Sequence, residues 1–179
     1  MSLIDELIDV LGEQAVQTGD AIAAAHHADW SGVAPVVPMA LILPRDTEQV
    51  AAAMRLCHAH RVAIVPQGGL TGLAGGAVPR PDAVALSLKR MNRIESIDTA
   101  ASTLQVQAGA TLQQVQEAAA AEGLQFGVDL GARGSCQIGG NISTNAGGNG
   151  VLQFGMMRQQ VLGLEVVLAD GTVLPMPRP

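Results

Sequence analysis

Glycine is concentrated in two short segments of this chain. Five of the 21 glycines lie between Gly68 and Gly76, and seven lie between Gly131 and Gly150. Glycine weakens helices and strands, so a cluster of glycines indicates backbone held in conformations that other residues resist. The two segments are therefore expected to form shaped loops, and they are the first places to look for a binding site.

The first segment, residues 66–72 (PQGGLTG), directly follows a continuous apolar run at residues 62–65. That run is typical of a strand buried on both faces. Consecutive amides in a glycine-rich turn can point inward together and bind an anion, and Thr71 adds a hydroxyl donor. The segment predicts a pyrophosphate cradle that needs no lysine. Two common phosphate-binding motifs are excluded, because the chain contains neither a Walker A loop nor a G-x-G-x-x-G motif. The alternative is a tight turn that binds no ligand.

The second segment, residues 129–148 (DLGARGSCQIGGNISTNAGG), combines glycine with serine, threonine and asparagine. The glycines allow a flat ligand to approach closely, and the polar side chains offer hydrogen bonds to its rim. A flavin is a planar cofactor of this kind. The alternative is a long irregular loop, which is uncommon in compact domains unless it is functional.

Hydrophobic periodicity predicts an α+β chain with two small sheet layers and helices outside. A helix is expected from the spacing of Ile4, Leu7, Ile8 and Leu11, ending near Gly12. Strands are expected at residues 40–43, 62–65, 83–88, 104–108 and 161–168.

Cap and turn signals add detail to this prediction. Asp46 or Thr47 is expected to cap a helix whose buried face includes Cys57. Thr111 has capping-box spacing to Gln114, in a helix that stops near Gly123. The pair Asp170-Gly171 indicates a hairpin turn.

The composition excludes several functional classes. A hydrophobic content of 48% with 15% charged residues is typical of a folded globule. The net charge of −6 and a single lysine argue against binding to nucleic acid. Two distant cysteines do not form a disulfide scaffold, and the acidic N-terminus is unlike a signal peptide, so a cytoplasmic location is expected.

Cys57, His58 and His60 lack further ligands, so no metal site is predicted. His26 and His27 are expected at the surface, and Cys136 is expected to be buried.

Five segments together resemble a known family: residues 28–30, 44–50, 66–72, 129–148 and 161–174. The chain resembles FAD-linked oxidases of the vanillyl-alcohol oxidase and p-cresol methylhydroxylase type, and within them the D-2-hydroxyglutarate and D-lactate dehydrogenases. The resemblance implies an α+β, two-subdomain FAD-binding fold that is truncated at its C-terminus. It divides the chain into an N-terminal helical segment at residues 1–34 and an incomplete FAD-binding domain at residues 35–179, without the substrate domain.

The resemblance also implies site residues. The first loop, which binds the FAD pyrophosphate mainly through the backbone amides of residues 68–72, comprises Pro66, Gln67, Gly68, Gly69, Leu70, Thr71 and Gly72. The diphosphate and ribityl region is lined by Asp129, Ser135, Gly139 and Gly140. The isoalloxazine ring is approached by Ser143, Asn145, Gly147 and Gly148. Gly69 and Leu70 stand where some relatives attach the flavin through histidine, so the FAD is expected to be non-covalent.

The implied reaction is oxidation of a D-2-hydroxy acid to the 2-oxo acid by transfer of a hydride to the flavin. The base belongs to the absent domain, so no catalytic residue is assigned to this chain. The expected partners are a small 2-hydroxy acid and an electron acceptor, either an electron-transfer flavoprotein or a quinone, while a homodimer is left open. A non-catalytic FAD-binding fragment and a domain for a nucleotide other than a flavin are the alternatives.

Overall fold

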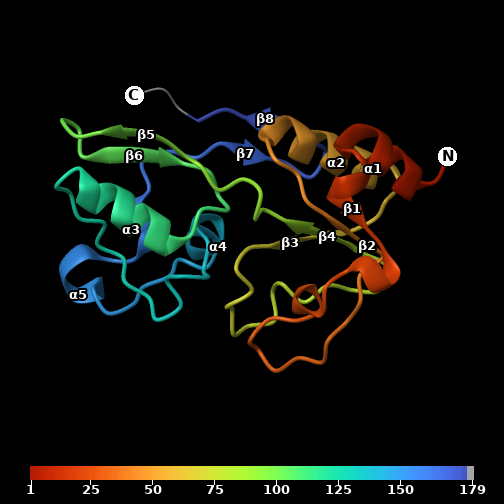
Figure 1. Cartoon of the computed structure of the whole chain (residues 1–179), viewed down its shortest axis with the longest axis horizontal. Helices are drawn as coiled ribbons and strands as arrows, with labels where there is room; N and C mark the ends of the chain where they lie inside the picture. The colour runs from red at the N-terminus through yellow and green to blue at the C-terminus, as the bar shows by residue number, and fades with distance from the viewer. Residues whose placement is uncertain (177–179) are drawn as a thin grey trace. The chain divides into compact units, whose positions relative to one another are not determined.

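The computed structural model describes residues 1–176 and divides the chain into two compact units (Figure 1). The first unit comprises Met1–Arg90 together with the chain from Gly163 onward. The second unit comprises Met91–Leu162. Each unit has its own cluster of buried hydrophobic side chains, so each is described by itself.

A four-stranded sheet forms the centre of the first unit. In spatial order its strands are β1 (Val16–Gln17), β2 (Ala40–Ile42), β4 (Val84–Ser87) and β3 (Ile64–Gln67). The strands β2, β4 and β3 are parallel, and β1 is antiparallel to β2. All residues of β2 and β4 are buried, which confirms the strands expected at residues 40–43 and 83–88.

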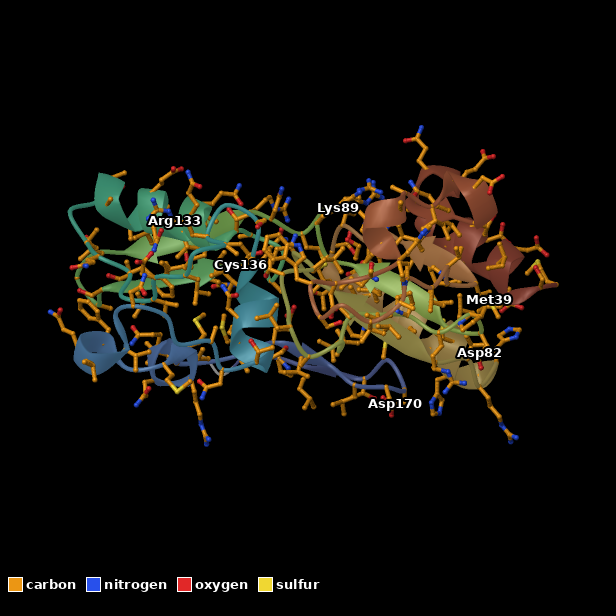
Figure 2. All side chains as sticks on the ribbon, turned by 90° about the horizontal axis from the view of Figure 1, so that it is seen from below. Met39, Asp82, Lys89, Arg133, Cys136 and Asp170 are labelled. Carbon is orange, nitrogen blue, oxygen red and sulfur yellow. The ribbon has the colours of Figure 1, made fainter. Side chains whose placement is uncertain are left out.

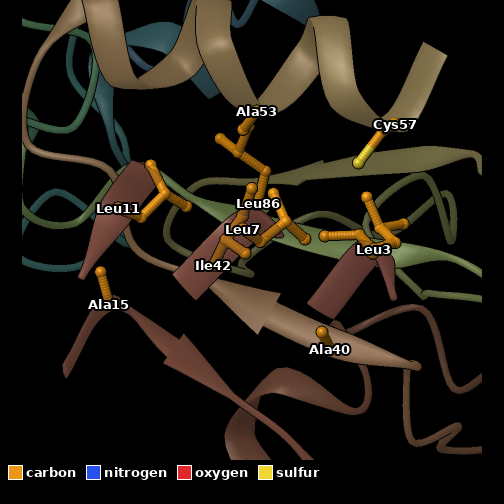
Figure 3. Close-up of a cluster of buried hydrophobic side chains, with 10 residues drawn as sticks. Leu3, Leu7, Leu11, Ala15, Ala40, Ile42, Ala53, Cys57 and Leu86 are labelled. Carbon is orange, nitrogen blue, oxygen red and sulfur yellow. The ribbon is translucent and has the colours of Figure 1, made fainter. Parts of the chain in front are cut away.

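Two helices, α1 (Leu3–Leu11) and α2 (Thr47–Ala59), pack with one face of this sheet (Figure 3). Leu7 of α1 and Ile42 of β2 are fully buried there, and Cys57 of α2 is 1% exposed. A smaller cluster forms separately from Ile22, Leu41, Leu43 and Ala85. Since adjacent strand residues alternate between faces, Leu41 and Ile42 belong to the two different clusters.

Local capping explains where these helices begin and end. Ser2 and Asp5 form a capping box at the start of α1, and Gly12 at φ +86° ends it. Asp46 accepts a 2.8 Å hydrogen bond from the Gln49 amide at the start of α2. Both expected helices are therefore confirmed.

The expectation that residues 62–65 form a strand buried on both faces is wrong. The strand β3 is Ile64–Gln67. Within residues 1–176 it lies at the edge of the sheet, with only β4 beside it. Ile64 and Val65 are half-buried and Pro66 is exposed. An edge strand tolerates proline because one side of the strand needs no N–H donor.

The C-terminal hairpin of the first unit consists of β7 (Val166–Val167) and β8 (Val173–Leu174). Gly171 in its turn adopts φ +81° and accepts a hydrogen bond from Arg55 of α2 at 3.3 Å. The hairpin turn at Asp170-Gly171 is confirmed, whereas the strand expected at residues 161–168 is only two residues long. The described part of the first unit also contains three short 3-10 helices: Glu13–Ala15, Gly19–Ala21 and Ala24–His26.

The second unit pairs one β-hairpin with four helices. Its elements are β5 (Ile94–Asp98), β6 (Thr103–Val106), α3 (Leu112–Ala121), α4 (Ile138–Ser143), α5 (Val151–Phe154) and α6 (Met157–Gln160). Thr111 and Gln114 form the expected capping box of α3, and Gly123 beyond its end has φ +72°. Leu112, Val115 and Val128 are fully buried at the centre of the unit. Among the residues that the structure describes, no helix is long and apolar enough to cross a membrane.

Candidate functional site

The first glycine-rich loop begins at the carboxyl end of the parallel strands in the first unit. Pro66 and Gln67 are the last residues of β3, and Gln67 lies in register with Ser87 at the end of β4. Ligands of open α/β sheets bind beyond the carboxyl ends of the strands. The loop therefore begins where such a sheet places a ligand.

Leu70 lies in the left-handed region of backbone space, with φ +58°. This conformation costs a residue with a Cβ atom roughly 1–2 kcal/mol. Such strained backbone persists only where the surrounding structure enforces it, and it is concentrated at functional sites. The residues at positions 68–71 are half-buried and Gly72 is exposed, so this loop is accessible to a ligand.

The segment that contains Asp29 packs beside this loop. Its carboxylate accepts hydrogen bonds from the amides of Ser31 at 3.0 Å and Ala77 at 3.4 Å. Hydrogen bonding by Ser31 lowers the pKa of Asp29. A Cβ atom on Gly72 would lie 3.8 Å from the same carboxylate. Residues 28–30 and 66–72, two of the five segments that carry the family resemblance, are therefore neighbours.

His26 is a residue that sequence reasoning misplaced. It was expected at the surface but is only 8% exposed, and its ring is hydrogen-bonded to the fully buried side chain of Gln67. The side chain of Gln67 is directed into the protein, so any contact that Gln67 makes with a ligand involves its backbone.

In the second unit, residues 129–148 form a compact folded segment rather than a long irregular loop. The short helix α4 occupies its centre, and its two ends meet in a β-bridge between Asp129 and Gly148. The Asn149 amide donates a 2.9 Å hydrogen bond to the carbonyl of Asp129. Asn145 adopts φ +49°, a conformation that asparagine tolerates better than most residues.

Three glycines of this segment are required by packing within the protein itself. A Cβ atom on Gly139, Gly147 or Gly148 would meet, respectively, Ala108 Cβ at 2.8 Å, Val151 Cγ2 at 2.8 Å and the Asp129 carbonyl oxygen at 1.9 Å. These glycines shape the segment, and their presence needs no ligand to explain it.

Gly140 differs from these three, because a Cβ atom there would meet no heavy atom of the described residues within 4 Å, apart from its chain neighbours and its own helix. It is exposed and lies in the first turn of α4, where alanine would be the better helix former. Open space beside a helical glycine is the arrangement expected where a ligand approaches the backbone closely.

The polar side chains of the segment are largely engaged with the protein. Ser143 donates to the Gly139 carbonyl at 2.9 Å, and Ser135 donates to the Ala132 carbonyl at 3.2 Å. Asn145 accepts a 2.9 Å hydrogen bond from the Arg158 amide, which joins the end of α4 to the start of α6. The hydroxyl oxygens of Ser143 and Ser135 retain acceptor capacity, because each hydroxyl has two lone pairs.

Two open depressions in the second unit include predicted site residues. One of about 530 Å³ is lined by Asn145 and Arg158, and one of about 460 Å³ is lined by Asp129 and Arg133. Asp129 pairs with Arg133 at 3.7 Å and accepts a 3.2 Å hydrogen bond from the Asn149 side chain. Arg133 is thus balanced by a carboxylate of its own segment.

The cysteines lie in the interiors of the two units. Cys136, which is labelled in Figure 2, is 3% exposed. Its sulfur receives a 3.5 Å contact from the Asn141 side-chain amide. Burial raises the pKa of the Cys57 thiol to about 11. His60 pairs with Glu6 at 3.3 Å. Within residues 1–176, no three His, Cys, Asp or Glu side chains are close enough to hold a metal ion.

Comparison with known proteins identifies the family. A family model described as an FAD-binding domain matches residues 38–176. The chain belongs to this family of FAD-binding domains. Its cofactor is FAD, and the α+β, two-subdomain fold expected from the sequence is confirmed.

Relatives of this FAD-binding domain include proteins named mitochondrial D-2-hydroxyglutarate dehydrogenase. The protein from Oryza sativa subsp. indica is 43% identical over 93% of this chain and 30% of its own length. The Bos taurus protein is 45% identical over 83% of this chain and 27% of its own length. A Schizosaccharomyces pombe protein named mitochondrial D-lactate dehydrogenase is 38% identical over 94% of this chain and 31% of its own length.

Solved structures share the fold. Alkyldihydroxyacetonephosphate synthase superimposes with a TM-score of 0.88 at 21% identity, over 98% of this chain and 38% of that one. p-Cresol methylhydroxylase superimposes with a TM-score of 0.80 at 22% identity, over 96% of this chain and 34% of that one.

The relatives correct the expected cellular location, and they are much longer than this chain. The expected cytoplasmic location is contradicted, because the rice, cattle and fission yeast relatives are all named mitochondrial proteins. The FAD-binding domain spans about 30% of the length of these relatives.

The residues present fit an FAD. Besides the open space at Gly140, Ser87 Oγ and Gln137 Oε1 are buried side-chain atoms without a hydrogen-bond partner in the part of the chain that the structure describes. Such atoms are rare in native proteins and indicate a partner supplied by water or a ligand. Ser87 ends β4 beside Gln67, and Gln137 directly precedes α4. Sequence reasoning assigned neither residue to the site, although Ser87 lies within the strand expected at residues 83–88 and Gln137 lies within residues 129–148.

Proposed function

We propose that this FAD-binding domain is the flavin-holding part of an oxidoreductase that converts a D-2-hydroxy acid into the 2-oxo acid. The substrate belongs to the 2-hydroxyglutarate or lactate class. The observation that carries the proposal is the identity of 43–45% with proteins named D-2-hydroxyglutarate dehydrogenase, over 83–93% of this chain. When bound, FAD supplies the acceptor for the hydride that leaves the substrate carbon.

In this proposal the loop of residues 66–72 binds the pyrophosphate through backbone N–H groups and the Thr71 hydroxyl. The loop contains no lysine or arginine, so its affinity depends on how well its amides are aligned rather than on net charge. Its position after β3 and the left-handed Leu70 support this assignment. Gly69 and Leu70 provide no histidine for a covalent flavin link, so the cofactor is non-covalent.

The segment of residues 129–148 supplies the second set of proposed contacts. Gly140 admits the cofactor close to the backbone, while Gly139 holds α4 against Ala108 so that Gly140 stays accessible. The ribityl and diphosphate groups are assigned to Asp129 and Ser135 in addition to these glycines. The isoalloxazine edge is assigned to Ser143 and Asn145, with Gly147 and Gly148 shaping the turn beside them.

The proposed roles leave acid–base catalysis to groups outside this chain. Residues 35–179 are proposed to act as the FAD-binding domain, and residues 1–34 as a helical segment preceding it. The reduced flavin is proposed to pass its electrons to an electron-transfer flavoprotein or a quinone. Assembly of the protein as a homodimer is also a proposal. The alternative is an FAD-binding fragment without activity of its own.

The proposal is tested first by cofactor retention. The purified chain is mixed with FAD, passed through gel filtration, and its absorption spectrum is recorded. We expect flavin bands that co-elute with the protein at one FAD per chain and are released on acid precipitation. Loss of all flavin on the column refutes the proposed site, and flavin that remains on the precipitate refutes non-covalent binding.

Turnover separates the enzyme from the inactive fragment. The FAD-loaded chain is assayed with D-2-hydroxyglutarate, D-lactate and their L-enantiomers, using a dye as electron acceptor. Reduction of the dye by a D-enantiomer alone supports the oxidoreductase. No reduction by any of the four acids, with FAD still retained, supports the non-catalytic alternative.

A further inference from the structure

A buried hydrogen-bonded pair joins the end of β3 to the 3-10 helix of residues 24–26. Gln67 is fully buried and His26 is 8% exposed. His26 Nδ1 lies 2.7 Å from Gln67 Oε1. An amide oxygen can only accept, so His26 donates this bond and its Nδ1 carries the proton.

The amide nitrogen of Gln67 completes the connection. Gln67 Nε2 donates to the His26 carbonyl at 2.9 Å and to the Ala77 carbonyl at 3.0 Å. Both amide protons and one oxygen lone pair are therefore used, in an environment that excludes water. Because Gln67 lies at the start of the loop of residues 66–72 and Ala77 lies beyond its end, one side chain joins the two ends of the loop to each other and to His26.

We propose that the His26–Gln67 pair is a positioning device, which fixes residues 68–72 in the conformation whose amides bind the FAD pyrophosphate. This inference rests on the cofactor role proposed above for that loop. The loop needs such a device because Leu70 occupies a left-handed conformation that it would leave if it were free. A site that binds through aligned amides loses affinity when the alignment relaxes.

Two variants of His26 form a matched test. In His26→Asn the side-chain amide N–H stands close to the place of Nδ1–H, whereas in His26→Gln the amide reaches toward the place of Nε2. Both are neutral amides, so they differ mainly in where the donor lies. We expect His26→Asn to keep the FAD dissociation constant within about threefold of wild type, and His26→Gln to raise it about tenfold, because Gln67 Oε1 is then buried without a donor.

Gln67→Glu tests the other half of the pair. The side chain keeps its shape, but a carboxylate replaces the N–H donors that face the carbonyls of His26 and Ala77. We expect a rise of at least tenfold in the FAD dissociation constant. If this variant fails to fold, the two His26 variants still decide the question.

The experiment is a fluorescence titration of FAD with the full 179-residue wild-type and variant chains. Circular dichroism at the titration temperature verifies that each chain is folded, and the same signal followed during heating gives its melting temperature. Weaker binding by folded His26→Gln, with affinity retained in His26→Asn, supports the inference. Equal affinity in all folded variants overturns it while leaving the proposed function intact, as does a fall in melting temperature with no change in affinity. Failure of the wild-type chain to bind FAD overturns the proposed function and this inference together.

Discussion

Replacing Gly140 with alanine is expected to move stability and cofactor affinity in opposite directions. The residue lies within α4, does not need a positive φ, and faces open space. Alanine is favoured over glycine in a helix by roughly 0.5–1 kcal/mol. In a chain of this size that gain raises the melting temperature by roughly 1–4 °C. The added methyl group also occupies the space assigned to FAD, where overpacking costs roughly 1–3 kcal/mol, so the affinity for FAD falls roughly 5- to 150-fold.

Gly139→Ala is the matched control, one residue away in the same helix. Its Cβ would lie 2.8 Å from Ala108 Cβ, and the Gly139 amide already donates to the Ala108 carbonyl at 2.8 Å. This variant is expected to lose roughly 1–3 kcal/mol of stability. The assays are thermal unfolding by circular dichroism without FAD and fluorescence titration with FAD. A Gly140→Ala chain that is more stable and binds FAD as tightly as wild type would refute the close approach of the cofactor at this glycine.

Three further outcomes follow from the structure. Because burial raises the pKa of the Cys57 thiol from 9.0 to about 11, the folded chain holds this proton more tightly than the unfolded chain, and stability should fall by roughly 2 kcal/mol between pH 9 and pH 11. Urea unfolding across that range checks this, and an equal slope in Cys57→Ala would contradict it. Gly171→Ala places a Cβ atom 2.5 Å from the Ala51 carbonyl oxygen, on a residue with φ +81°, so the chain should lose roughly 2–3 kcal/mol of stability. Urea unfolding measures this loss, and no loss would contradict the docking of the hairpin on α2. Thr111→Ala removes the cap of α3 and should cost about 1 kcal/mol in the same assay, whereas Thr111→Ser should cost much less.

Helix ends and the hairpin turn were predictable because their determinants lie within a few residues. Asp46 needs only the amide of Gln49, and Thr111 needs only Gln114. A sequence window contains both partners of each interaction. The same is true of Gly171, whose positive φ closes a turn between two adjacent strands.

The strand β5 was missed because its pattern is interrupted. A register shift lies between Ile94 and Ser96 in its pairing with β6. A bulge of this kind adds one residue, so the half-buried Ile94 and Ile97 are three positions apart instead of two or four. Sequence reasoning looks for strict alternation and therefore finds no strand there.

Strand order and the partner of His26 could not be predicted from the sequence, because they depend on residues far apart in the chain. Whether residues 62–65 lie at the centre or the edge of a sheet depends on β4, about 20 residues later in the chain. Pro66 was the one local indication of an edge. His26 has no periodic pattern around it, and its partner Gln67 is 41 residues away. Only the folded chain brings this pair together.

The glycine count that first identified the second segment combined two different causes. Gly139, Gly147 and Gly148 are required by contacts inside their own unit, and they would be needed even if no cofactor were bound. An added Cβ atom on Gly131 or Gly140 would meet none of the described atoms within 4 Å beyond its chain neighbours and its own helix, so packing within the chain does not require these two glycines. Among the glycines of this segment, the evidence for a ligand therefore comes from these two positions rather than from the number of glycines. A chain of this fold that had lost its cofactor should keep the first three glycines and be free to replace the other two.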